Sequence, residues 1–195
     1  KNHNMKKVAI LTCMSLLTSF FMVQVKAQSE EETKKWMEYM TPSAVHKMMA
    51  SWDGEWTEDI NMWMAPDAPA QKMTSSCTNR MILGGRYQES KHIGNFNGMP
   101  FEGVGTLAWD NAGKEFINTW VDNFGTGMMV LKGTWDEATK TINLKGEMRD
   151  PMTGLQTTVR EVLKVIDENT QVMEQYGVKD GKEFKNMEIR MTRKK

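Results

Sequence analysis

Four acidic side chains stand out in segments that alternate polar and apolar residues: Asp122, Glu161, Glu174 and Glu188. Carboxylates at suitable separations act as general acids and bases, and a pair of them cleaves glycosidic bonds in many hydrolases. Their separation in space does not follow from the sequence, so glycoside cleavage is not predicted. Since charges are rarely buried unpaired, we expect surface or salt-bridged acids. Enzymatic use of Glu161 or Glu174 as a general base is the alternative.

Histidine is scarce, with only His3, His46 and His92 in the chain. A Ser–His–acid triad therefore has few ways to assemble, and no G-x-S-x-G segment occurs. The sequence also lacks H-E-x-x-H, paired C-x-x-C and G-x-x-x-x-G-K-[ST] motifs, while Gly103-Val104-Gly105 lacks the third glycine of a dinucleotide site. We expect no cofactor and no hydrolase triad.

Methionine is unusually abundant, with 19 residues. Thioethers select Cu(I), so periplasmic Cu(I) binding through methionines is one hypothesis. Met62 and Met64 share a predicted strand face, and Met48 and Met49 lie close to His46 on a predicted helix. All four methionines fall on apolar faces, where methionine commonly fills the core. We therefore expect core packing and no metal site, with Cu(I) binding as the alternative.

The first 27 residues predict a secretory signal peptide with upstream residues before Met5. Met5 is followed by two lysines, a mostly apolar run to Val25 and a small-residue ending at Ala27. Polar residues interrupt the run and no stop-transfer pattern follows it, so no membrane span is expected after the signal is removed. The protein should then be periplasmic or secreted after cleavage near Ala27.

Charge and cysteine content limit the partners and the crosslinks. The 25 basic and 25 acidic residues balance, and removing a signal with four lysines and no acid would leave a net charge of −4. A nucleic-acid binder should be more basic. Cleavage would leave Cys77 as the sole cysteine, so no internal disulfide can form. We expect a buried, inert thiol, with a reactive or intermolecularly paired thiol as the alternative.

The segment after the expected cleavage site predicts a lead-in over residues 28–41 and then one short helix. Thr41 and Pro42 supply an N-cap and a first-turn proline. Apolar residues then recur at helical spacing, at Val45, Met48, Met49 and Trp52.

From Gly54 onward the pattern has a period of two and is broken by nine turn segments rich in Asp, Asn and Gly. Nine breaks imply about ten strands, and no helix-length segment separates them. Neighbouring strands should therefore pair as a meander, and closure would remove the exposed edges. The sequence predicts that residues 42–195 are a single all-β domain, an up-and-down antiparallel β-barrel preceded by a short N-terminal helix.

A barrel of this size can hold one small ligand. Strand alternation predicts that Phe116, Trp120, Glu161, Glu174 and Tyr176 face the interior as ligand-binding residues. Apolar walls with a few polar groups are typical of small-molecule sites, whose volumes begin at roughly 300 Å³. We expect such a cavity; the alternative is an interior filled by side chains, with Glu161 paired to an arginine.

Gly54-Glu55-Trp56 forms a G-x-W segment just after the predicted helix, and the last predicted strand bears Arg190 and Arg193. This order resembles the calycin superfamily of lipocalins, fatty-acid-binding proteins and nitrobindins. In those barrels the tryptophan closes one end and a basic side chain of the last strand covers its ring. The resemblance implies barrel closure by Trp56 with Arg190 and Arg193.

Nitrobindin-like barrels bind haem through one histidine, which makes His92 a candidate ligand. His92 shares strand parity with Ser90 and flanks Lys91. We therefore expect His92 to be solvated and not to bind haem.

Residues 45 to 193 also resemble the bacterial family catalogued as domain of unknown function 1579. The similarity implies a fold and assigns no activity, ligand or catalytic residue. The segments that carry it include Leu83-Gly84-Gly85-Arg86-Tyr87, Phe101-Glu102-Gly103, Trp109-Asp110-Asn111, Trp120-Val121-Asp122, Asp150-Pro151-Met152-Thr153-Gly154, Arg160-Glu161 and Met187-Glu188-Ile189. The leading hypothesis is an exported barrel that binds a small, mainly apolar molecule without chemistry.

Overall fold

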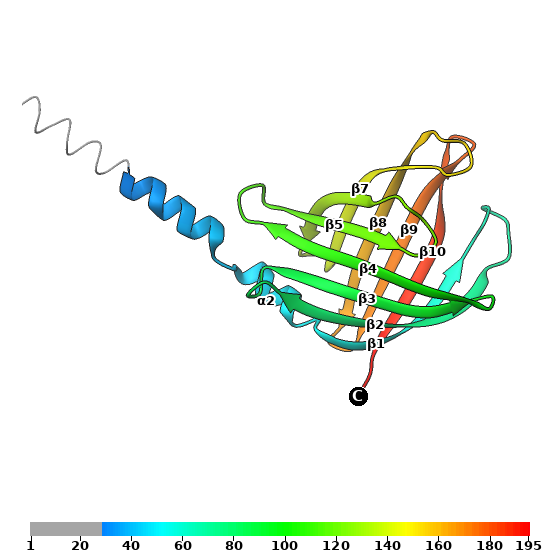
Figure 1. Cartoon of the computed structure of the whole chain (residues 1–195), viewed down its shortest axis with the longest axis horizontal. Coiled ribbons are helices and arrows are strands. Elements are labelled where there is room, and N and C mark those ends of the chain that lie inside the picture. Colours follow the sequence, from blue (N-terminus) through cyan, green and yellow to red (C-terminus); the bar gives the residue numbers. More distant parts are fainter. Residues whose placement is uncertain (1–28) are drawn as a thin grey trace, which may run out of the picture. The chain divides into compact units, whose positions relative to one another are not determined.

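The computed structural model describes residues 29–195 (Figure 1). Residues 29–40 are helical and belong to a different unit from residues 42–195, which form one compact body. The expected signal peptide, residues 1–27, lies outside the described residues. Within those residues, no helix is both long enough and apolar enough to cross a membrane.

Ten antiparallel strands form a closed barrel in which each strand pairs with the next one along the chain and β1 pairs with β10 (Figure 1). The prediction of an up-and-down barrel of about ten strands behind a short helix is confirmed. The strands are β1 (Gly54–Met62), β2 (Gln71–Ile82), β3 (Tyr87–Phe96), β4 (Met99–Asp110), β5 (Glu115–Asp122), β6 (Met129–Asp136), β7 (Thr141–Arg149), β8 (Gln156–Asp167), β9 (Thr170–Lys179) and β10 (Lys182–Arg193).

Helix α2 (Ala44–Ala50) begins two residues later than the sequence suggests. Its N-cap is Ser43, whose backbone N–H donates to His46 Nδ1 at 2.9 Å. Histidine therefore takes the place that Glu or Gln usually has in a capping box. Burial, followed by the charge of Arg86, lowers the pKa of His46 and favours the neutral ring that this bond requires.

The C-terminal end of α2 is fastened to the barrel through backbone carbonyls. Gln88 Nε2 on β3 donates to the carbonyl of Met49 at 2.7 Å, and Asn79 Nδ2 on β2 donates to that of Trp52 at 3.3 Å. Each carbonyl also accepts a second hydrogen bond, Met49 from the Trp52 backbone N–H at 2.9 Å and Trp52 from Trp56 Nε1 at 3.1 Å, so the two amide side chains add ties between this segment and the strands. The helix is thereby held at one end of the barrel.

Trp56, the tryptophan of the G-x-W segment, lies next to the end of α2, where its indole Nε1 donates to the carbonyl of Trp52 at 3.1 Å. Its side chain is fully buried, and the Arg193 guanidinium lies 4.3 Å from its ring centroid. Arg193 Nη2 also donates to the carbonyl of Ser51 at 2.8 Å, which ties β10 to the end of the helix. Arg190 is exposed, so the structure places Arg193 alone of the two arginines over the tryptophan.

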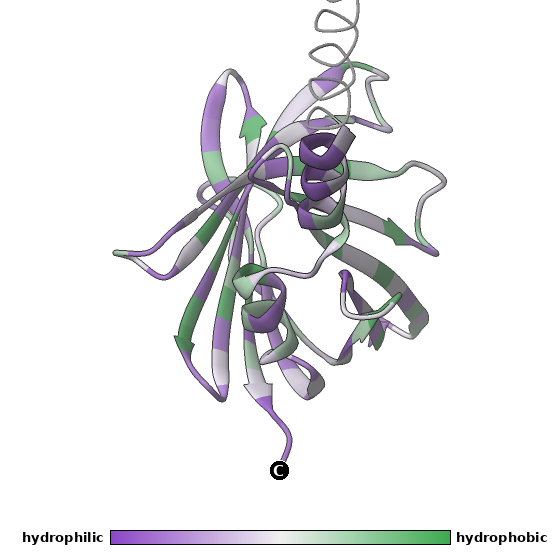
Figure 2. Ribbon diagram, turned by 90° about the vertical axis from the view of Figure 1, so that its left-hand side faces the viewer, coloured by the Kyte–Doolittle hydropathy of each residue, from purple (hydrophilic) through white to green (hydrophobic). Residues whose placement is uncertain are grey.

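Alternating hydrophobic and hydrophilic bands follow the strands (Figure 2). The hydrophobic side forms a core between α2 and the barrel that consists of Met49, Trp52, Phe116, Leu131, Ile142, Leu144 and Val159. Met64, expected on the apolar face of the first strand, lies beyond the end of β1 and is 65% exposed. The alternation of apolar residues thus predicted most of the core residues on the strands, and the prediction for Met64 failed because β1 ends before this residue.

Candidate functional site

The interior of the barrel contains a cavity of about 130 Å³, which Trp52, just after α2, lines together with residues of the strands. This volume is smaller than the few hundred Å³ that the sequence led us to expect. Its wall combines apolar side chains with several polar ones. The lining residues are Trp52, Glu58, Asn79, Gln88, Ser90, His92, Gly105, Leu107, Asn118, Trp120, Met129, Ile142, Leu144, Glu161, Leu163, Gln171, Met173, Ile189 and Met191.

A second hollow, of about 480 Å³, follows strands β1 and β2. Only residues 59–61 and 72–74 line it, so two neighbouring strands supply the whole surface. No titratable cluster or aromatic side chain borders this hollow. The interior cavity is therefore the candidate site.

The five predicted ligand-binding residues separate into three groups. Trp120 on β5 and Glu161 on β8 line the cavity together. Phe116 is fully buried in the core and does not line it. Glu174 and Tyr176 on β9 face away from the cavity, where Gln171 and Met173 of the same strand face it. The predicted parity of β9 was therefore wrong by one residue.

Glu174 belongs instead to a cluster of charges outside the barrel. Its carboxylate lies 2.8 Å from Lys164 Nζ and 3.3 Å from Lys185 Nζ, and Tyr176 Oη donates to it at 3.1 Å. Burial would raise the pKa of Glu174, but these hydrogen bonds outweigh burial and hold it below its usual value. Tyr176 stacks beneath Arg160, whose guanidinium is 3.7 Å from its ring centroid. This surface network explains both residues without a ligand.

Glu161 is the carboxylate that the barrel does bury, at 6% exposure. Gln175 Nε2 donates to Oε1 at 3.0 Å and Asn118 Nδ2 donates to Oε2 at 3.3 Å. Burial raises the pKa of Glu161, and the two amide bonds offset only part of that effect. The cavity wall therefore contains a carboxyl group that is easier to protonate than an exposed one.

Trp120 is held in a defined orientation in the wall of the cavity. Its indole Nε1 donates to Asp122 Oδ2 at 2.7 Å. The His92 ring meets its face edge-on, with centroids 4.9 Å apart. Both contacts restrict rotation of the indole, so Trp120 is a rigid part of the wall.

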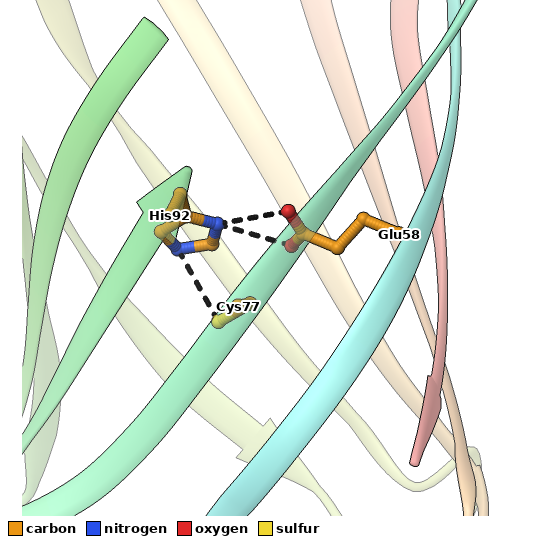
Figure 3. A group of neighbouring side chains, drawn as sticks. All are labelled: Glu58, Cys77 and His92. Atoms are coloured by element: carbon orange, nitrogen blue, oxygen red, sulfur yellow. Dashed lines mark hydrogen bonds and ion pairs between the residues drawn. The ribbon is translucent and has the colours of Figure 1, made fainter. Parts of the chain in front are cut away.

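Three side chains on consecutive strands meet beside the cavity: Glu58 on β1, Cys77 on β2 and His92 on β3 (Figure 3). Cys77 and His92 are paired in the β2–β3 register. The exposed fractions of the Glu58 and His92 side chains are 1% and 12%. The expectation of a solvated His92 was therefore wrong, because Ser90 and His92 lie on the inner face and Lys91 on the outer one.

The His92 ring connects the other two residues through its two nitrogens (Figure 3). Nδ1 lies 3.0 Å from Glu58 Oε1 and 3.1 Å from Oε2, and Nε2 lies 3.7 Å from Cys77 Sγ. Ser75 Oγ donates to Glu58 Oε2, and Cys77 Sγ donates to Asn79 Oδ1 at 3.1 Å. Thiol, imidazole and carboxylate thus form one continuous buried chain.

Cys77 is 1% exposed, as expected for a buried thiol. Burial, together with the charge of Glu58, raises the pKa of Cys77. In the absence of a cation the thiol therefore stays protonated and is a poor nucleophile.

The sequence did not reveal this cluster as a site. Glu58, Cys77 and His92 are separated by 19 and 15 residues, a spacing that matches no known ligand motif. The three residues come together only through the register in which the strands pair, and this register cannot be read directly from a sequence.

Among the methionines considered for Cu(I), Met49 is fully buried in the core, whereas neighbouring His46 is hydrogen-bonded to Ser43.

Comparison of the chain with known proteins identifies the family to which it belongs. None of the curated proteins matches the chain. A solved structure titled as a redesigned β-barrel is 11% identical, with a TM-score of 0.40, and the match covers 75% of this chain and 95% of that one. The model of a family described as protein of unknown function (DUF1579) matches residues 41–193, and the chain belongs to that family.

Proposed function

We propose that this protein is an exported, non-catalytic barrel that binds one compact small molecule in its interior. The observation that carries the proposal is the interior cavity of about 130 Å³, whose largely apolar wall contains a few polar groups. Binding sites for small molecules have this composition. The sequence predicts only that the ligand is mainly apolar, and the cavity volume adds a limit on its size.

The cavity matches a single ring. A cavity of about 150 Å³ lined by apolar side chains is known to bind benzene. A haem or a long-chain fatty acid is several times larger and would require the barrel to open. We therefore propose a ligand about the size of a single six-membered ring, since benzene occupies a cavity of about 150 Å³.

Two polar groups in the wall suggest the ligand's substituents. Gln171 Nε2 is buried and has no hydrogen-bond partner among the described residues, so it can donate to an oxygen of a ligand. Glu161 supplies an acceptor, or a donor once protonated. Trp120 supplies an aromatic surface. The proposed ligand is a ring that bears a hydroxyl or carbonyl group.

Titration of chelator-treated protein with phenol, benzoate and laurate, followed by calorimetry and tryptophan fluorescence, tests this proposal. The single-ring compounds should bind and laurate should not. Leu163→Phe fills the cavity without removing a polar group and should abolish binding. Equal binding of phenol by the wild type and by this variant would exclude the interior as the site.

The matched polar variants are Glu161→Gln and Glu174→Gln, two carboxylates on neighbouring strands that differ in which face they occupy. Glu161→Gln should change the affinity for phenol by about tenfold, since one hydrogen bond to a charged group contributes about 1.5 kcal/mol or more. Glu174→Gln should leave the affinity unchanged. The opposite ranking would place the ligand outside the barrel.

One observation favours a second function, an enzyme acting on a small substrate in the same cavity. Glu161 is buried, borders the cavity and has a raised pKa, features that suit a general acid or base. Incubation with ring-sized esters and ketones, with product analysis, tests this function. Turnover that survives Glu161→Gln would exclude Glu161 as the base.

A further inference from the structure

We propose that Cys77 and His92 bind a divalent transition-metal ion of the zinc class at the wall of the cavity, with Glu58 positioning the histidine. Cys77 Sγ and His92 Nε2 are the direct ligands. This site goes beyond the small-molecule function, because it requires no organic ligand. Its residues belong to three consecutive strands (Figure 3).

The distance between the two ligand atoms suits a shared ion. Cys77 Sγ and His92 Nε2 are 3.7 Å apart. Zinc bonds of about 2.3 Å to sulfur and about 2.0 Å to nitrogen at a tetrahedral angle separate the two ligand atoms by about 3.5 Å. The ion therefore fits between them with little movement of either side chain.

Glu58 fixes the imidazole tautomer that metal binding requires. Its carboxylate faces His92 Nδ1 at 3.0 to 3.1 Å, so Nδ1 carries the proton and donates it to the carboxylate. Nε2 then presents its lone pair toward Cys77. Carboxylate–histidine–zinc arrangements of this kind orient the ring and raise its basicity.

Charge balance also favours a dication. Glu58 is buried at 1% exposure, and His92 is the only basic side chain that pairs with it among residues 29–195. Its Oε1 atom has no partner among these residues other than His92 Nδ1, at 3.0 Å. Burying an uncompensated carboxylate is costly. A dication together with one thiolate and one carboxylate gives a neutral cluster, and metal coordination itself deprotonates the thiol.

The remaining coordination positions face the cavity. Asn79 Oδ1 is 3.1 Å from Cys77 Sγ, and both Asn79 and His92 line the cavity. Water or an oxygen of a bound molecule can therefore complete the coordination. A thiolate, an imidazole and oxygen ligands match Zn²⁺ better than Mg²⁺ or Ca²⁺, which prefer oxygen alone.

The test is addition of Co²⁺, as a spectroscopic probe, and of Zn²⁺ to chelator-treated full-length protein under reducing conditions. We expect one equivalent of either metal, a thiolate-to-Co²⁺ charge-transfer band and displacement of Co²⁺ by Zn²⁺. Absence of both the band and bound zinc in the folded wild-type protein would overturn the proposal.

Three variants distinguish the roles. Cys77→Ser should abolish the charge-transfer band, and His92→Gln should weaken zinc binding at least 100-fold. Glu58→Gln should retain the band and weaken binding 10- to 100-fold, the usual effect of removing a group that orients a histidine ligand. His46→Gln is the control and should bind as the wild type does. Circular dichroism without metal verifies that each variant is folded.

Two outcomes contradict the assignment of roles. If Glu58→Gln abolishes the band as completely as Cys77→Ser, the carboxylate is a direct ligand and the proposed geometry is wrong. If Cys77→Ser retains full zinc affinity, the ion binds elsewhere. Failure of the ring titration leaves this experiment intact, because the titration is performed without metal.

Discussion

The indole of Trp120 on β5 lies directly against the backbone of Gly103 on the neighbouring strand β4. A Cβ atom at Gly103 would lie 2.5 Å from both Cη2 and Cζ2 of the ring. Such contacts are far inside van der Waals distance. The absence of a side chain at Gly103 thus creates the space in which Trp120 forms part of the cavity wall.

Gly103→Ala should therefore displace the Trp120 ring and destabilise the barrel. We expect a loss of about 1–3 kcal/mol, the usual cost of inserting a methyl group into a packed interior. Urea denaturation gives this value. Gly127→Ala is the matched control, since no atom lies within 4 Å of its Cβ position. An equal, small effect at both positions would show that Trp120 moves freely.

Arg193→Ala should destabilise the protein by about 2–3 kcal/mol, because it removes a cation–π contact and several hydrogen bonds to backbone carbonyls. Arg190→Ala, on the same strand but exposed, should change stability by less than about 0.5 kcal/mol. Thermal unfolding of the two variants makes the comparison. Similar losses would assign the effect to net charge and not to the contact with Trp56.

Glu161→Gln should become more stable relative to the wild type as the pH rises above 4.5. A carboxyl group whose pKa is raised in the folded state favours folding when protonated, and this contribution is lost as the pH rises through the folded-state pKa. Each unit of pKa shift corresponds to about 1.4 kcal/mol. Melting temperatures of both proteins between pH 4 and pH 8, roughly spanning this titration, measure the effect. A constant difference across that range would show that Glu161 titrates normally.

His46→Gln should reduce acid sensitivity. The lowered pKa of His46 means that the neutral ring favours folding above the unfolded pKa of 6.5, and this stabilisation is lost as the pH falls through the folded-state pKa. Glutamine can accept the same hydrogen bond from Ser43 without titrating. The wild type should therefore lose more stability than the variant between pH 7 and pH 5, about the range where histidine titrates. Parallel melting curves would exclude this role.

The barrel itself could be predicted from the sequence, since its alternation and turn residues indicate the strands directly. Trp120 and Glu161 both line the cavity. The face of β8 that holds Glu161 is clearly apolar, with Val159, Leu163 and Val165, whereas both faces of β5 are mixed. Strand β9 has no such contrast: Val172 and Tyr176 alternate with Met173, and both faces include polar residues. Its parity therefore could not be chosen from the pattern, and Glu174 and Tyr176 were assigned to the wrong face.

The cluster at Glu58, Cys77 and His92 depends on information of a different kind. Glu58 lies two residues after Trp56 on β1 and is buried like it, but the sequence does not show which residues lie opposite. The neighbours of Glu58 depend on how β1, β2 and β3 align. Alignment results from the packing of the whole barrel, so the site appears only once the fold is complete.

Nine of the ten strand pairings join neighbours in the chain, and only β1–β10 joins distant segments. Trp56 and Arg193 are opposite each other in that pairing. Closing a long loop costs more conformational entropy than forming a hairpin. The largest single loop-closure cost therefore falls on the β1–β10 pairing, and the residues that stabilise this pairing stabilise the step that closes the barrel.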